Sequence, residues 1–187
     1  MSDTIRTVPY DDRWPSDYEL IAERLREVTP AAAELHHIGS TAIPGMAAKE
    51  VIDIQLSVSR LTDIDIRTIE NVGFHHIADR ADHQPPEQSL PCEELAKLFF
   101  RSDRPKAHLH VREFGRFNQR YSLLCRDFLR ANSEPAASYK QIKIELAERF
   151  PADKHSYYAI KDPVFDILMA GANVWAKEVK WTLPPAD

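Results

Sequence analysis

The sequence predicts an α+β (α/β) fold, a mixed β-sheet followed by a helical C-terminal layer. Two observations predict it. Short alternating segments typical of strands occur over roughly residues 31–115, and apolar residues at helical spacing dominate roughly residues 116–180. The 187 residues suit one domain over 1–187, and we find no internal repeat.

The part of the chain before residue 75 alternates helix, turn and strand. Ser16 and Glu19 have the spacing of a capping box, which predicts a helix that begins there and ends at Thr29-Pro30. Gly73 suits the end of a second helix. The elements expected in this part are helices over 16–28 and 65–72 and strands over 35–39 and 51–58.

A polar loop over residues 79–94, with two adjacent prolines, separates this part from the rest of the sheet and is expected to lie beside the site. Beyond it we expect a strand pair and then helices. Ser133 is expected to cap the second of these helices, and Asp162-Pro163 to open the last, because Asp caps well and Pro suits the first turn. The elements expected here are strands over 97–101 and 106–112 and helices over 121–131, 135–150 and from 162 onward.

Composition indicates a globular, water-soluble protein with a formal net charge of −5. The N-terminus has no signal-peptide pattern and no apolar run reaches membrane-spanning length, so we expect a cytoplasmic protein without a membrane partner. The two cysteines, Cys92 and Cys125, are expected to be reduced. An acidic chain disfavours duplex DNA as a partner. Between residues 104 and 161, however, basic residues outnumber acidic ones, which is typical either of solvated helix surfaces or of a wall facing an anion.

A Gly-Ser turn followed by a strand with one carboxylate is the most informative motif. Gly39 and Ser40 can turn sharply and present backbone N–H groups and a hydroxyl to a phosphate. Asp53 follows in a strand where it alternates with large apolar residues. This combination is common in metal-assisted chemistry on a phosphorylated ligand.

Strand alternation predicts a cluster of four polar side chains. Asp53 shares a strand face with Gln55, and His108 shares one with His110. If the two strands are neighbours with a common core, all four line one polar face. Asp53, His108 and His110 are then the catalytic candidates, and Gln55 joins them as a candidate metal ligand. Three interpretations remain open: Mg²⁺ or Mn²⁺ on a bound triphosphate, a softer ion such as Fe²⁺, Mn²⁺ or Zn²⁺, and a hydrogen-bonded cluster without metal.

Basic residues are the remaining candidates for phosphate binding. Lys49 precedes the Asp53 strand, and Arg126, Lys143 and Lys161 lie in the helical half. Guanidinium forks and ammonium groups are natural phosphate partners, and the alternative for each is an ordinary solvated charge.

Several segments resemble the sequence motifs of a known family and occur in the same order along the chain. The resemblance extends from about Val8 to Trp175. The segments are His37-Ile-Gly-Ser-Thr-Ala-Ile-Pro-Gly45, Arg104-Pro-Lys-Ala-His-Leu-His110, Cys125-Arg-Asp-Phe-Leu-Arg130, Tyr139-Lys-Gln-Ile-Lys143 and Tyr157-Tyr-Ala-Ile-Lys161. They resemble the GrpB family, whose fold is similar to that of the nucleotidyltransferase superfamily. The resemblance implies a nucleotidyltransferase-like mixed sheet and favours Arg126, Lys143 and Lys161 among the basic residues.

One position departs from active nucleotidyltransferases, which carry Asp-x-Asp or Asp-x-Glu after the Gly-Ser turn. Here the second position is Gln55, whose amide oxygen can touch a metal ion but brings no negative charge. A site for two metal ions is weakened by this difference.

The resemblance implies a protein that binds a nucleotide or another phosphorylated small molecule with a divalent ion, Mg²⁺ or Mn²⁺ first and Zn²⁺ or Fe²⁺ as alternatives. Transfer of a nucleotidyl group to an acceptor is the implied reaction. Some fungal proteins similar to GrpB are associated with arginine-containing cyclodipeptide synthesis, which implies acyl transfer with tRNA as partner. In some bacteria a GrpB-like domain is fused to dephospho-CoA kinase, which implies a non-catalytic partner or folding module.

Overall fold

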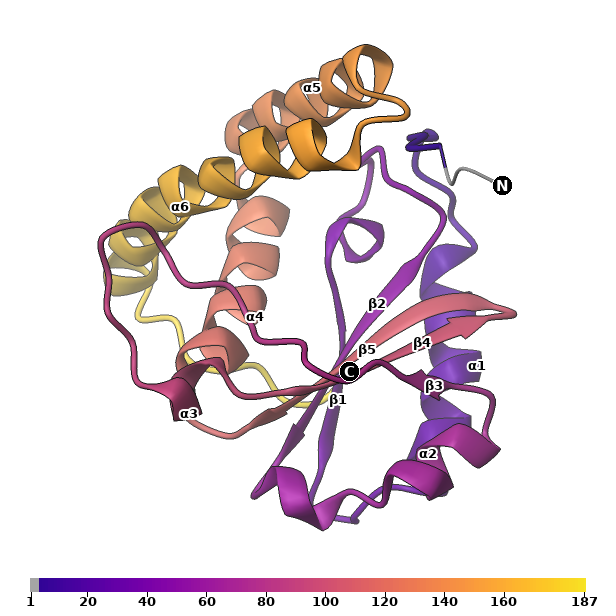
Figure 1. Cartoon of the computed structure of the whole chain (residues 1–187). Helices are drawn as coiled ribbons and strands as arrows, with labels where there is room; N and C mark the ends of the chain where they lie inside the picture. Colours follow the sequence, from indigo (N-terminus) through magenta and orange to yellow (C-terminus); the bar gives the residue numbers. More distant parts are fainter. Residues whose placement is uncertain (1–3) are drawn as a thin grey trace.

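The computed structural model describes residues 4–187 and contains one five-stranded mixed sheet with helices on both faces (Figure 1). The strands are β1 (Glu34–Ile38), β2 (Ile52–Val58), β3 (His75–His76), β4 (Leu98–Asp103) and β5 (Lys106–Glu113), in the spatial order β1-β2-β5-β4-β3. The helices are α1 (Trp14–Arg26), α2 (Ile66–Asn71), α3 (Cys92–Leu95), α4 (Phe117–Ala131), α5 (Ser133–Arg149) and α6 (Lys154–Glu178), with 3-10 turns η1 (Ser40–Ala42) and η2 (Leu61–Asp63). The predicted α+β class, with a mixed sheet and a helical C-terminal layer, is confirmed.

Apolar side chains from alternate strand positions build the core between the sheet and α1. Ile54 of β2 and Leu109 of β5 are fully buried there, together with Leu25 of α1. A second apolar cluster lies among α4, α5 and α6, on the other side of the sheet. Because side chains alternate along a strand, the polar positions of β2 and β5 face this helical side.

β2 and β5 are the parallel pair at the centre of the sheet, and the other neighbours are antiparallel. Their register places Asp53 opposite His108 and Gln55 opposite His110. β4 and β5 form the predicted hairpin across residues 104 and 105. The register therefore brings the polar positions of the two strands onto one face.

The start predicted for the last helix is wrong, because α6 begins at Lys154 and contains Pro163 in its interior. Asp153 caps the helix instead, with its side chain accepting a hydrogen bond from the Ser156 N–H at 3.0 Å. A proline inside a helix removes one backbone hydrogen bond. Packing on both sides compensates, since Tyr157 is buried and Phe165 packs against the helical cluster.

Three other predicted helix starts lie too late in the sequence. α1 begins at Trp14 rather than Ser16, with Pro15 in its first turn, so the capping box is not used. α4 begins at Phe117 rather than Tyr121. α5 follows Asn132 as its N-terminal flanking residue, so Ser133 is its first helical residue and not its cap. The loop over 79–94 is confirmed for most of its length, and α3 begins near its end.

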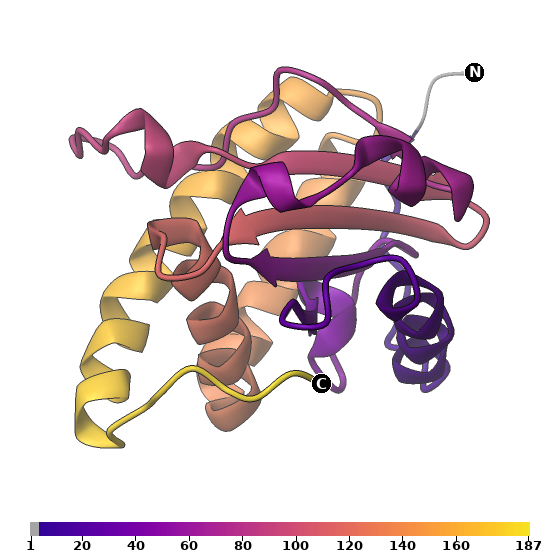
Figure 2. The same ribbon diagram turned by 90° about the horizontal axis from the view of Figure 1, so that it is seen from below.

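The segment after α6 returns across the molecule to the edge of β1, as the yellow trace in Figure 2 shows. The Asp187 N–H donates to the Leu35 carbonyl at 3.1 Å. The Asp187 carboxylate accepts from the His37 N–H at 2.7 Å and from Arg126 at 2.8 Å. None of the helices in residues 4–187 combines the length and apolar content that a membrane span requires.

Candidate functional site

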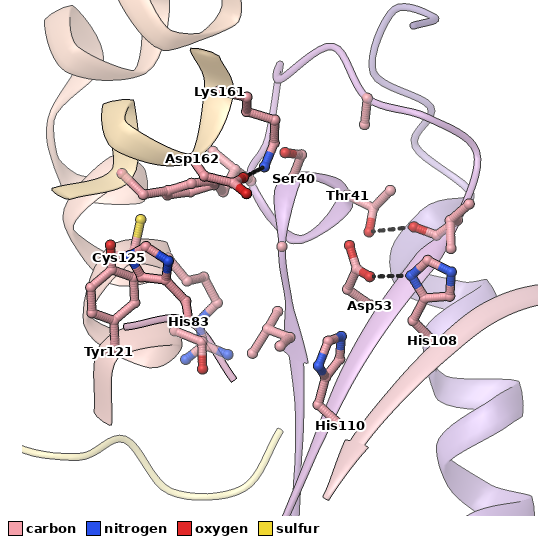
Figure 3. Close-up of a pocket in the computed structure, with 18 of the residues that line it drawn as sticks. Ser40, Thr41, Asp53, His83, His108, His110, Tyr121, Cys125, Lys161 and Asp162 are labelled. Atoms are coloured by element: carbon pink, nitrogen blue, oxygen red, sulfur yellow. Dashed lines mark hydrogen bonds and ion pairs between the residues drawn. The ribbon is translucent and has the colours of Figure 1, made fainter. Parts of the chain in front are cut away.

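β2 and β5 place a carboxylate and two imidazoles together on the helical side of the sheet (Figure 3). The His108 Nδ1 lies 3.1 Å from the Asp53 Oδ1. Asp53, His108 and His110 each offer one ligand atom, and these atoms all lie within 4.8 Å of one another. The spacing follows directly from the parallel register, and the group is compact enough to hold one metal ion.

Nearby charges set the protonation of this cluster. Burial alone would raise the pKa of Asp53, but the hydrogen bond with His108 and the positive charge of Lys49 bring it below its ordinary value. Asp53 is therefore an anion at neutral pH.

His110 is held neutral, because burial and then the cations of Arg112 and Lys97 lower its pKa well below the ordinary value. Arg112 Nη2 and Lys97 Nζ lie 3.4 and 3.5 Å from the His110 Nδ1. Both groups can only donate hydrogen bonds, so Nδ1 accepts and the ring proton lies on Nε2.

Gly39 brings the Gly-Ser turn into contact with the Asp53 carboxylate. It has a φ of 71°, and a Cβ atom at this position would lie 2.5 Å from the Asp53 Oδ2. Only glycine combines this backbone conformation with such a close approach. Thr41, in η1, bonds the His37 Nε2 at 2.9 Å and fixes the turn against β1.

Three lysines line the same cavity, which has a volume of about 380 Å³. Lys49 Nζ donates to the Tyr158 hydroxyl at 2.6 Å, and Lys161 Nζ lies 3.4 Å from Asp162 and 4.3 Å from the centre of the Phe165 ring. The third lysine, Lys143, is buried. Figure 3 shows Lys161 and Asp162 of α6 on one side of the cavity and the carboxylate–imidazole cluster of the sheet on the other.

Lys143 reaches the cavity from α5 and is only 3% exposed. Its Nζ donates to the Ala47 carbonyl at 2.6 Å. Burial, with a smaller contribution from the charge of Lys161, lowers the pKa of Lys143 to about 7.

Gln55 and Arg126 are engaged in hydrogen bonds with the protein itself. The Gln55 Oε1 accepts from Arg112 at 2.6 Å and from Ser122 at 2.5 Å, and its Nε2 donates to the Gln119 carbonyl at 3.1 Å. Gln55 is fully buried and does not line the cavity. Arg126 lines it, but its guanidinium is buried and paired with Asp127 and Asp187 at 2.8 Å each.

Three residues of the site were not identified by the sequence analysis: Asp82 and His83 of the loop, and Arg112 of β5. Asp82 enters the cavity from the loop and bonds both Arg112 and Lys97, at 2.5 and 2.8 Å. His83 lies beside it, with its Nε2 2.8 Å from Asp166 of α6. Arg112 continues the alternation of His108 and His110 and could have been found from it, whereas the loop residues follow no period.

The fold and the site define an α+β protein with a cavity between a mixed sheet and its C-terminal helices, in which a carboxylate, two imidazoles and three lysines meet. Residues 4–170 match the GrpB protein family. The chain belongs to this family.

Two relatives and one solved structure describe the similarity further. A dephospho-CoA kinase of Mycolicibacterium paratuberculosis is 31% identical over 95% of this chain and 48% of its own length. UPF0157 protein YqkA of Bacillus subtilis is 30% identical over 92% of this chain and 48% of its own length. This chain thus spans about half the length of these two relatives. The crystal structure of the conserved protein GrpB from Enterococcus faecalis superposes with a TM-score of 0.75 at 24% identity, covering 91% of this chain and 99% of that one.

Proposed function

We propose that the cavity binds a nucleotide or another phosphorylated small molecule together with one divalent metal ion. One observation carries the proposal. The cluster of Asp53, His108 and His110 shares a single cavity with three lysines. An anionic ligand could contact a metal ion held by the cluster and the lysine ammonium groups at the same time.

The side chains of the cluster suit a metal ion. One carboxylate and two imidazoles form a donor set that fits Mn²⁺, Zn²⁺ or Fe²⁺, whereas Mg²⁺ would rely mainly on Asp53 and on phosphate oxygens. Such an ion would neutralise phosphate charge and polarise a phosphoryl oxygen. Asp53 contributes its negative charge. His110 would become a ligand at Nε2 only after its ring proton moved to Nδ1, which requires Arg112 and Lys97 to move away from that nitrogen.

A single ion suits these residues better than two. In a two-ion site the second acid would stand at position 55, but Gln55 brings no charge and its oxygen is engaged by Arg112 and Ser122. The Arg112 cation at this position would repel a second metal ion.

Lys49 and Lys161, with the turn at Gly39 and Ser40, would bind the phosphate groups. Lys143 would add a third positive charge when protonated. Arg126 is left out of the phosphate site because its guanidinium already pairs with two carboxylates. Nucleotidyl transfer to an acceptor extends this proposal, since Lys49 and Lys161 could stabilise the charge that develops on a transferred phosphate.

Calorimetric titration with Mn²⁺, with and without ATP, tests the proposal on the wild type and on Asp53→Asn. We expect ATP to strengthen Mn²⁺ binding and the variant to lose at least about tenfold in Mn²⁺ affinity, a typical cost of disturbing a metal site. Asp103→Asn, at an exposed strand end, is the matched control and should bind like the wild type. Unchanged affinity in a folded Asp53→Asn protein would overturn the metal site. Binding seen only with charged tRNA would favour acyl transfer instead.

A second candidate function is a supporting module for a dephospho-CoA kinase. It is favoured by the relative of that name, of whose length this chain spans 48%. Adding the purified chain to the kinase of the same organism should then raise the kinase's thermal midpoint. No change in that midpoint would argue against this candidate.

A further inference from the structure

Lys143 is buried and has no acidic partner, unlike the half-buried Lys97 and Lys161. No carboxylate oxygen of residues 4–187 lies within 4.0 Å of its Nζ, whereas Lys97 pairs with Asp82 at 2.8 Å. A buried ammonium without a counter-ion is costly, and the neutral amine avoids that cost. The pKa of about 7 reflects this balance.

Lys143 lines the cavity, and the Ala47 carbonyl is the hydrogen-bond acceptor of its amine. One N–H is held by the Ala47 carbonyl at 2.6 Å, on the wall that precedes β2. Because the nitrogen is tetrahedral, its remaining positions, including the lone pair of the neutral form, point away from that carbonyl. The Tyr139 ring lies 5.3 Å from Nζ and closes another side.

We propose that Lys143 is a nucleophile that forms a Schiff base with the aldehyde or ketone group of a phosphorylated ligand. The amine nitrogen attacks the carbonyl carbon and forms a C–N bond. Both amine protons then leave with the carbonyl oxygen as water, and a C=N bond remains. The step needs no oxidant or metal ion.

The phosphate of this ligand would lie at Lys49 and Lys161. The position of the phosphate therefore rests on the proposed function, but it does not depend on the metal ion. A phosphate placed directly on Lys143 would keep the amine protonated and unreactive. The ligand must therefore extend from the two outer lysines to Lys143, and its carbonyl carbon is the end that meets the amine.

Reductive trapping on the wild-type protein tests the proposal without any variant. The protein is incubated with pyridoxal 5′-phosphate at pH 7, reduced with borohydride, and mapped by peptide mass spectrometry. We expect one label per chain, on Lys143, formed at least about tenfold faster than at exposed lysines, because a pKa near 7 leaves far more neutral amine. Labels spread over surface lysines, with none favoured at Lys143, would overturn the proposal.

Two variants sharpen the result. Lys143→Met should abolish the fast label, and Lys140→Met, which removes an exposed lysine of the same helix, should keep it. In the wild type the labelling rate should rise from pH 6 to 8 and then level off. A rate that keeps rising to pH 10 would show an ordinary lysine and overturn the proposal.

Pyridoxal without its phosphate separates this proposal from the proposed function. Slower labelling of Lys143 by pyridoxal supports both the nucleophile and the phosphate site. Equal labelling supports the nucleophile and overturns the phosphate position. Mn²⁺ titration without an aldehyde reports on the metal site alone.

Discussion

Asp53 and Gln55 lie two positions apart on the same face of β2, yet only Asp53 reaches the cavity. Asp53 contacts the glycine turn, while Gln55 lies beneath α4 and bonds Ser122 and the Gln119 carbonyl. Alternation along the strand predicted their common face. It could not predict how α4 would cover one of them, because that depends on tertiary packing.

Gln55→Glu tests this difference between the two positions. The new carboxylate would pair with Arg112 rather than with a metal ion, so Mn²⁺ affinity should change less than about twofold. The change also replaces the N–H donor to Gln119 with an acceptor facing a carbonyl, which should cost about 1–3 kcal/mol of stability. Calorimetry and urea unfolding measure the two effects. A several-fold gain in Mn²⁺ affinity would show that position 55 is a metal ligand.

The contacts of the loop over 79–94 could be predicted least well from the sequence. The loop has no period, and the structure fixes it through Asp82 to two strands and through His83 to α6. Asn118 of α4 adds a bond to the His83 carbonyl at 2.9 Å. Because these contacts join residues that are distant in sequence, no local sequence pattern predicts them.

Asp82→Asn should loosen this loop and destabilise the protein. Arg112 and Lys97 would remain buried beside each other without their carboxylate, at a cost of about 3–5 kcal/mol. Urea unfolding measures the loss, and hydrogen exchange should rise over residues 79–94. Asp79→Asn is the control, because Asp79 is exposed in the same loop and asparagine tolerates its positive φ of 56°. Equal stability of the two variants would show that the buried ion pairs contribute little.

Four of the five strands and the polar face of the central pair were predictable, because both follow from a period of two, whereas the two-residue strand β3 is too short to show a period. The first residues of the helices were less predictable. Asp162-Pro163 has a typical start pattern, but Asp153 caps the helix earlier and packing tolerates the proline. The lysine partners could not be predicted either, since Ala47 and Tyr158 meet Lys143 and Lys49 only in the folded chain.

Stability should fall in mild acid because His37 is buried in the neutral form. Burial lowers the pKa of His37 from 6.5 to about 4. Between these values the unfolded chain binds a proton that the folded chain does not, so the free energy of unfolding decreases as pH falls from 6.5 to 4. The contribution is at most about 3 kcal/mol.

His37→Gln should reduce the slope of this pH dependence, whatever it does to stability at pH 7, and His110, which is also buried in the neutral form, should account for part of the slope that remains. Urea unfolding at several pH values measures the slope. His75→Gln, at an exposed strand position, should leave the slope unchanged. If the wild type and His37→Gln lose stability in parallel, His37 does not carry the effect.

A crystal structure with Mn²⁺ and a non-hydrolysable ATP analogue, recorded with anomalous scattering from manganese, would locate both the metal ion and the phosphates. We expect one anomalous peak bound by Asp53 with at least one of the two histidines, and phosphate density beside Lys49 and Lys161. A peak outside this cavity, two peaks with one at Gln55, or phosphates bound away from the lysines would contradict this expectation.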